Sequence, residues 1–247
     1  MAPSLARASR SYRKRDTRDD DEPIGTWYES RSNTPTGACP NECYIPGVTR
    51  LAPKGQFENR KRRYLEELLA CRGVEEDLAL RSRFGFMAFH GGSLETKTDA
   101  IAEEAARKSE ASFYAIRQPP NLRWHIPSSL FRTEESPKLH AFFQRVEVVV
   151  TVHGFRRSAF PRHVMLGGRN RALAAHLAEA LRPALPSAVV VDDLTEIPQP
   201  IRGVHRDNPV NVPRLSGVQV ELSPMVRVEP TGLINALAEA ARTFVRR

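Results

Sequence analysis

The stretch VEVVVTVH, Val146–His153, decides the fold class of this chain. Its β-branched residues form an almost continuous apolar run, which is typical of a strand that is buried on both faces. Strands of this kind occur in parallel sheets that helices cover on both sides. The run stops at a histidine, and Gly154 follows it.

Strand and helix patterns alternate on both sides of this run. Further strands are predicted at FGFMAF (84–89), SFYAI (112–116), SAVVVDDL (187–194) and GVQVELS (217–223). Helices are predicted at residues 58–73, 96–111, 136–145, 169–185 and 231–247, with Thr98 and Ser136 as N-cap residues. We therefore expect an α/β fold with a mostly parallel mixed sheet that is flanked by helices on both faces.

Composition separates an expected tail from an expected globular part. Residues 1–50 are rich in charged residues, serine and proline and show little periodicity, which predicts a flexible charged N-terminal extension. Residues 51–247 are expected to form a single catalytic domain. The net charge of +8 favours a polyanionic partner, without distinguishing nucleic acid, an anionic membrane surface and an acidic polymer.

No segment of the sequence resembles a membrane span or a secretory signal. No run approaches the roughly 18 consecutive apolar residues of a transmembrane helix, and the first residues lack an apolar h-region. We therefore expect a cytoplasmic protein without a membrane partner. The three cysteines, Cys39, Cys43 and Cys71, are expected to be reduced thiols, and nothing near CPNEC completes a four-ligand zinc set.

Three of the predicted strands end in side chains that bind metals or move protons. FGFMAF is followed by His90 and then Glu95, the buried run ends at His153, and GVQV is followed by Glu221. Ligands of open α/β sheets bind beyond the carboxyl ends of the strands. Two histidines and two carboxylates are the parts of a hydrolytic zinc site, which uses three protein ligands and keeps one position open.

Each of these residues also has a structural interpretation. His90 is compatible with an ordinary turn after a strand, Glu95 with the start of the next helix, and His153 with a core histidine. Glu221 is harder to explain in this way, because an acid at the end of an apolar strand is costly unless it is paired or lies in a cleft. Their shared strand-end positions favour the site. His125 is a further candidate for the cleft, whereas His163 and His205 are predicted to lie in polar loops.

The order of the motifs resembles the poly-γ-glutamate hydrolase family. The resemblance runs from about Phe84 to Arg227 and is carried by FHGGSLETKTDAIA, HIPSSLF, VVVTVHGF, VMLGGRN and GVQVELSPMVR. It implies a zinc-carboxypeptidase-like fold and a hydrolase of γ-glutamyl amide bonds. One departure is Pro127, which stands where the family prefers threonine.

The resemblance also implies roles for single residues. The metal ligands fall on His90, Glu95 and His153, for one Zn²⁺ per chain, and the general base falls on Glu221. Arg227 corresponds to an anchor for a substrate carboxylate. Further substrate-binding candidates are His125, Ser128, Ser129, Arg169 and Asn170. The expected substrate is an acidic γ-glutamyl polymer or peptide.

Other functions remain open at the level of sequence. A related zinc carboxypeptidase or amidase would act on peptidoglycan or on small γ-glutamyl conjugates. A nucleic-acid-binding protein would use the basic run RKRRY (60–64) and the basic N-terminal block, but the aromatic residues that would stack bases are scattered. Manganese or iron accepts the same ligands as zinc. A family member without activity is a further alternative, and the sequence predicts no oligomeric state.

Overall fold

The computed structural model describes residues 62–244. The predicted N-terminal extension, the CPNEC motif, the first two residues of the basic run RKRRY and the last three residues lie outside this range. Within it, no helix is both long and apolar enough to cross a membrane.

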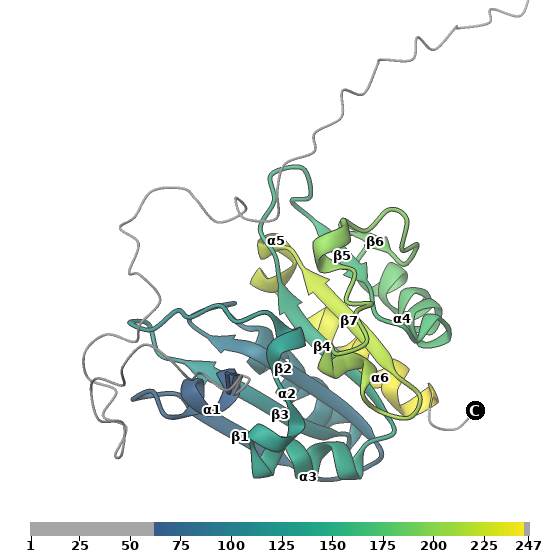
Figure 1. Ribbon diagram of the computed structural model, residues 1–247. Coiled ribbons are helices and arrows are strands. Elements are labelled where there is room, and N and C mark those ends of the chain that lie inside the picture. The colour runs from purple at the N-terminus through teal and green to yellow at the C-terminus, as the bar shows by residue number, and fades with distance from the viewer. Residues whose placement is uncertain (1–61, 245–247) are drawn as a thin grey trace, which may run out of the picture. The chain divides into compact units, whose positions relative to one another are not determined.

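The described residues form a mixed sheet whose strand order is β1-β3-β2-β4-β7-β5-β6 (Figure 1). Its strands are β1 (Glu75–Ala79), β2 (Phe84–Gly92), β3 (Ser112–Gln118), β4 (Val148–Gly154), β5 (His163–Leu166), β6 (Val189–Val191) and β7 (Gly217–Leu222). The four central strands β3, β2, β4 and β7 are parallel, as are β5 and β6. Two strands run antiparallel to their neighbours, β1 beside β3 and β5 beside β7. The prediction of a mostly parallel mixed sheet is confirmed.

Helices cover both faces of the sheet (Figure 1). They are α1 (Tyr64–Leu69), α2 (Thr98–Ser109), α3 (Pro137–Arg145), α4 (Arg171–Ala184), α5 (Pro224–Val228) and α6 (Thr231–Phe244), with short 3-10 turns η1 (Ser128–Leu130), η2 (Thr133–Glu135), η3 (Gln199–Ile201) and η4 (Pro209–Asn211). One core lies between the sheet and α2, α4 and α6, and a second core lies between the sheet and α1 and α3. Successive side chains of β2 point to opposite faces of the sheet. Phe86 and Ala88 therefore belong to the first core, and Met87 and Phe89 belong to the second.

The predicted elements agree with the structure except at two short strands, at the short helix α5, at the bounds of α1 and at the start of α2. Within the described residues α1 covers only Tyr64–Leu69 of the helix predicted over 58–73, and α5 was not predicted. Strands β1 and β5 were not predicted, because four or five residues without a clear apolar alternation give no strand signal. His163 therefore begins a strand and does not lie in a polar loop. The prediction of Thr98 as an N-cap is wrong: Thr98 is the first residue of α2, and its hydroxyl donates to the carbonyl of Glu95 at 2.8 Å.

Ser136 caps α3 as its sequence predicts. Its Oγ accepts hydrogen bonds from the backbone N–H groups of Lys138 and Leu139, both at 3.1 Å, and Pro137 occupies the first helical position. The same hydroxyl donates to the carboxylate of Glu76 on β1, so this one side chain ties the helix to the edge of the sheet.

Replacing Ser136 with alanine is expected to lower the free energy of unfolding by about 1–2 kcal/mol, because the cap and the bond to Glu76 are both lost. Urea unfolding of the purified proteins measures this change. Thr133→Ala is a suitable control, since its hydroxyl bonds only the exposed Glu134. A Ser136→Ala protein as stable as this control would contradict the assigned role of the cap.

Candidate metal centre and active site

The parallel central strands bring the predicted chemistry to one edge of the sheet. His90 lies near the carboxyl end of β2, and His153 lies at the corresponding end of β4. Glu221 lies near the end of β7, where it is the register partner of His153. Parallel strands end at the same edge, so three segments that are far apart in the sequence meet there (Figure 1).

A tight turn after β2 returns Glu95 to His90. The backbone N–H of Glu95 donates to the carbonyl of His90 at 2.8 Å. Gly92 has a φ of +69°, and a Cβ at this position would lie 2.4 Å from the carbonyl oxygen of Gln118 on β3. Only glycine fits such a turn, because both the backbone angle and the close approach exclude a side chain.

The side chains of His90, Glu95 and His153 converge on one point. Glu95 Oε1 lies 2.8 Å from His90 Nδ1, and Glu95 Oε2 lies 3.5 Å from His153 Nδ1. One ligand atom from each of the three residues lies within 4.8 Å of the other two. Ligands of a common zinc ion, each about 2.0–2.2 Å from it, have separations of this order. All three side chains are at least nine-tenths buried.

The hydrogen bonds of His90 show which of its two ring nitrogens presents a lone pair to the cluster. Nε2 lies 2.8 Å from the carbonyl oxygen of Ile126, which can only accept, so Nε2 carries a hydrogen. Nδ1 of the neutral ring is then an acceptor, and it lies 2.8 Å from an oxygen of Glu95 that also accepts. Two acceptors at this distance need a proton or a cation between them. A ligating histidine with its other N–H on a carbonyl is the usual arrangement in metal sites.

The electrostatics of the cluster support the same conclusion. Burial disfavours a charge on His90, but the carboxylate of Glu95 outweighs burial and raises the pKa of this histidine. Burial likewise disfavours the charged form of Glu95, yet His90 and His153 hold the pKa of its carboxyl well below the ordinary value. Glu95 therefore stays ionised and attracts positive charge to the cluster. The backbone N–H of Gly154 donates to Glu95 Oε2 at 2.7 Å and holds it in place.

His153 is the third member of the cluster. Its Nε2 is buried and has no hydrogen-bond partner among the residues of the described range. The other nitrogen, Nδ1, faces the carboxylate of Glu95. Two imidazoles and one carboxylate fit a zinc ion.

Glu221 is a buried carboxyl beside this cluster. Burial raises its pKa to about 7, while the nearby His153 opposes this rise. The amide of Gln219 donates to Glu221 Oε1 at 2.9 Å. A carboxyl with such a pKa exchanges protons readily near neutral pH.

His125 and Arg227 flank the cluster. The ring of His125 lies with its centroid 4.6 Å from that of His90. Partial desolvation and the nearby His90 lower the pKa of His125 to about 4, although its ring is still accessible to solvent. Arg227 of α5 donates from Nη1 to the carbonyl of Thr96 at 2.7 Å, and it packs against Gly154, where an added Cβ would lie 2.8 Å from its Cζ.

Arg169 and Asn170 lie far from the other candidates, near the amino end of β7. The backbone N–H of Asn170 donates to the carbonyl of Gly217 at 3.1 Å, four residues before Glu221 on the strand. The side chain of Asn170 caps α4 by accepting from Leu173, and it donates to the carbonyl of Leu215. The structure therefore does not bring this pair together with the metal-binding candidates.

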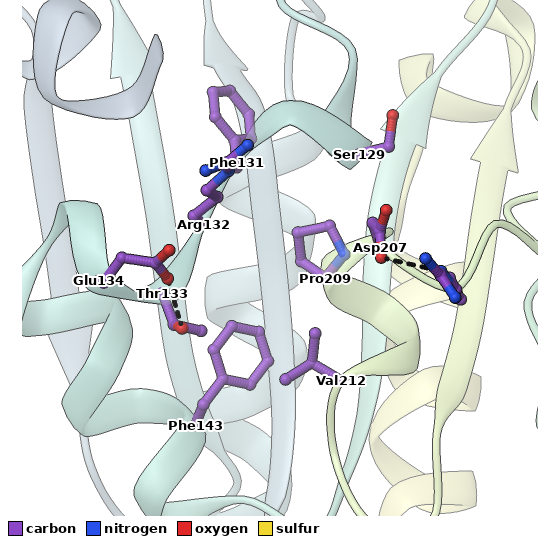
Figure 2. A pocket seen from close by; sticks show the side chains of 10 residues that line it. Ser129, Phe131, Arg132, Thr133, Glu134, Phe143, Asp207, Pro209 and Val212 are labelled. Carbon is purple, nitrogen blue, oxygen red and sulfur yellow. Dashed lines mark hydrogen bonds and ion pairs between the residues drawn. The ribbon is translucent and has the colours of Figure 1, made fainter. Parts of the chain in front are cut away.

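A groove of about 440 Å³ lies next to the loop that carries His125. It is lined by Ser129, Phe131, Arg132, Thr133, Glu134, Phe143, Arg206, Asp207, Pro209 and Val212 (Figure 2). None of the three metal-binding candidates lines it, but the ring of Phe131 lies 6.4 Å from that of His90. Of the predicted cleft residues, Ser129 reaches this groove, while Ser128 belongs to the same 3-10 turn, η1.

Two residues beside the site were not predicted, Gln219 and Asn208. Both are buried, and their amides are hydrogen-bonded to each other. A glutamine inside the apolar run GVQVEL, two residues before the candidate base, is the sequence signal that indicates such a role.

The pKa of Glu221 predicts how the stability of the metal-free chain depends on pH. The ordinary pKa of a glutamate is 4.5, so the folded chain keeps this proton to a higher pH than the unfolded chain. This proton contributes up to about 3 kcal/mol to the free energy of unfolding. The contribution is complete below the pKa of the unfolded chain and is lost as the pH rises to about 7. Glu221→Gln should remove this loss.

Urea unfolding with a chelator at pH 5 and pH 8 measures the effect. The stability of Glu221→Gln relative to wild type should rise between the two pH values, whereas the exposed control Glu229→Gln should show no such rise. An equal difference at both pH values would contradict the raised pKa.

Comparisons with known proteins agree with this site. A family model described as poly-gamma-glutamate hydrolase matches residues 71–233, which is more than half of the chain. A comparison with curated proteins gave no match.

Among the solved structures that match, two share the fold and a third shows a weaker likeness. A bacteriophage poly-gamma-glutamate hydrolase superposes with a TM-score of 0.59 at 20% identity, over 71% of this chain and 92% of that chain. The zinc-free apo form of a protein named YNDL gives a TM-score of 0.57 at 23% identity, over 70% and 90% of the two chains. A metallo-carboxypeptidase from Burkholderia cenocepacia gives 0.41 at 14% identity, over 66% and 56%. Since the family model covers both strand-end histidines and Glu221, the chain is a hydrolase of the poly-γ-glutamate hydrolase family.

Proposed function

We propose that this protein is a zinc-dependent hydrolase that cleaves amide bonds made through the γ-carboxyl of glutamate. The observation that carries the proposal is the convergence of His90 Nδ1, His153 Nδ1 and the Glu95 carboxylate beside the buried Glu221. Family membership supports the reaction class.

His90, Glu95 and His153 would hold one zinc ion through two imidazole nitrogens and a carboxylate. When bound, the ion supplies Lewis acidity, which polarises a carbonyl and lowers the pKa of water. The chain's own groups keep these ligands in place. The carbonyl of Ile126 fixes the ring of His90, and the N–H of Gly154 fixes the carboxylate of Glu95.

Glu221 would act as the general base. Its pKa of about 7 lets the carboxyl take a proton from the attacking water and later give that proton to the leaving amine. Only a group that exchanges protons near the working pH performs both steps efficiently. Burial among the strand ends also keeps bulk water away from the carboxyl, which is 5% exposed.

His125 and Arg227 would bind the substrate. The low pKa of His125 keeps its ring neutral at pH 7, so the ring can donate one hydrogen bond to the carbonyl oxygen of the scissile bond. The guanidinium of Arg227, beside Gly154, would pair with a free carboxylate of the γ-glutamyl unit. The net charge of +8 favours the approach of an acidic polymer.

Glu221→Gln tests the proposed mechanism most simply. The substitution keeps the size and the polarity of the side chain but cannot accept the proton, so kcat on poly-γ-glutamate should fall by about 10²–10⁴-fold. Zinc content per chain should remain that of wild type, because Glu221 is not among the proposed ligands.

Glu229→Gln, an exposed glutamate on the segment after α5, serves as the control and should keep wild-type activity. A Glu221→Gln protein that turns over like wild type would show that another group is the base. Chain-length analysis of the products separates internal cleavage of a polymer from release of terminal units.

A further inference from the structure

Gln219 is a buried amide on β7, two residues before Glu221. Residues two apart on a strand point to the same face, so Gln219 lies alongside the proposed base. The alternate residues Val218 and Val220 point into the core beneath α2, α4 and α6. Burying an amide on such a strand is costly unless its hydrogen bonds are made, and their partners therefore indicate what it does.

The amide of Gln219 is engaged on both sides. Its Nε2 donates to Glu221 Oε1 at 2.9 Å and to the carbonyl of Ile201 at 3.2 Å, which uses both N–H groups. Its Oε1 accepts from Asn208 Nδ2 at 2.9 Å. The side chain therefore connects the loop before β7 to the carboxylate of the base.

The hydrogen bonds of Asn208 fix the orientation of the Gln219 amide. Asn208 Oδ1 accepts from the backbone N–H of Val210 at 3.2 Å, so the NH₂ group of Asn208 points at Gln219. The facing atom of Gln219 must then be its oxygen, and its nitrogen faces the carbonyl of Ile201 and the carboxylate of Glu221. Two independent anchors thus agree on one orientation.

The loop around Gly203 closes on the same side chain. Gly203 has a φ of +64°, and a Cβ at this position would lie 2.7 Å from Gln219 Oε1. Backbone therefore packs directly against the amide and leaves it little room to turn.

We infer that Gln219, held by Asn208, is a positioning residue that fixes the carboxylate of Glu221 in its working orientation. The inference rests on the proposed function of Glu221. With Oε1 held by the amide, Oε2 is the oxygen that takes the proton from water. A misdirected carboxylate would still lie in the site, so substrate binding would be kept while the rate of the chemical step would fall.

Gln219→Met tests this role, because it keeps the length of the side chain and removes the donor. We expect kcat to fall by about 10–100-fold, the range typical of partners that orient active-site groups, with KM within about twofold of wild type and zinc content unchanged. Loss of stability alone would not produce this division between kcat and KM when activity is measured well below the unfolding temperature.

Asn208→Ser provides a second variant that does not alter β7. A serine can still accept from the N–H of Val210 but does not reach Gln219, so kcat should fall in the same direction. In the double variant Asn208→Ser/Gln219→Met, kcat should equal that of Gln219→Met alone. Asn235→Ser is the control, since Asn235 is exposed on α6, where its side chain accepts from Lys108 Nζ, and it has no bond to Gln219 or to the loop that holds it. It should stay within about twofold of wild type.

Crystal structures of the variants distinguish a failure of this inference from a failure of the proposed function. In Gln219→Met, the Glu221 carboxylate should leave its wild-type position or occupy several. An unmoved carboxylate, or wild-type kcat in both single variants, would overturn the inference while leaving the proposed function intact. If wild type and Glu221→Gln are equally inactive on γ-glutamyl substrates, the proposed function fails, and the position of the carboxylate still decides whether Gln219 positions Glu221.

Discussion

The site depends on the contacts that the carboxylate of Glu95 makes with two histidines. One of its oxygens faces a histidine from β2 and the other faces a histidine from β4, so a single buried side chain joins two strands of the sheet. The charge of the carboxylate explains why His90 resists losing its proton in the absence of a cation. It also explains why a divalent metal fits the same place, because the ion satisfies three acceptors that otherwise face one another.

The sequence predicted this site because its residues follow from strand direction. His90, His153 and Glu221 each end an apolar run, and parallel strands deliver their ends to one edge. Arg169 and Asn170 also follow an apolar run, but β5 is antiparallel to β7, so its end lies at the opposite edge. A strand of four residues carries no signal of its direction, which is why the sequence could not place this pair.

The residues that hold the proposed catalytic groups by hydrogen bonds were harder to predict than those groups themselves. The role of Gln219 depends on Asn208 and on the carbonyl of Ile201, which come from a loop that has no regular pattern. Their proximity results from how this loop packs on β7 and not from any spacing in the chain. The cap of α3 was predictable for the opposite reason, since the residues that Ser136 bonds are its immediate neighbours.

The central claim is that His90, Glu95 and His153 bind one metal ion through the Nδ1 atoms of both histidines. Anomalous diffraction at the zinc absorption edge, on crystals of the full chain grown with zinc, tests it directly. The account predicts a single strong peak per chain within coordination distance of both Nδ1 atoms and of the Glu95 carboxylate, absent from His153→Ala. A folded wild-type chain with no peak there, or with zinc bound only elsewhere, would contradict it.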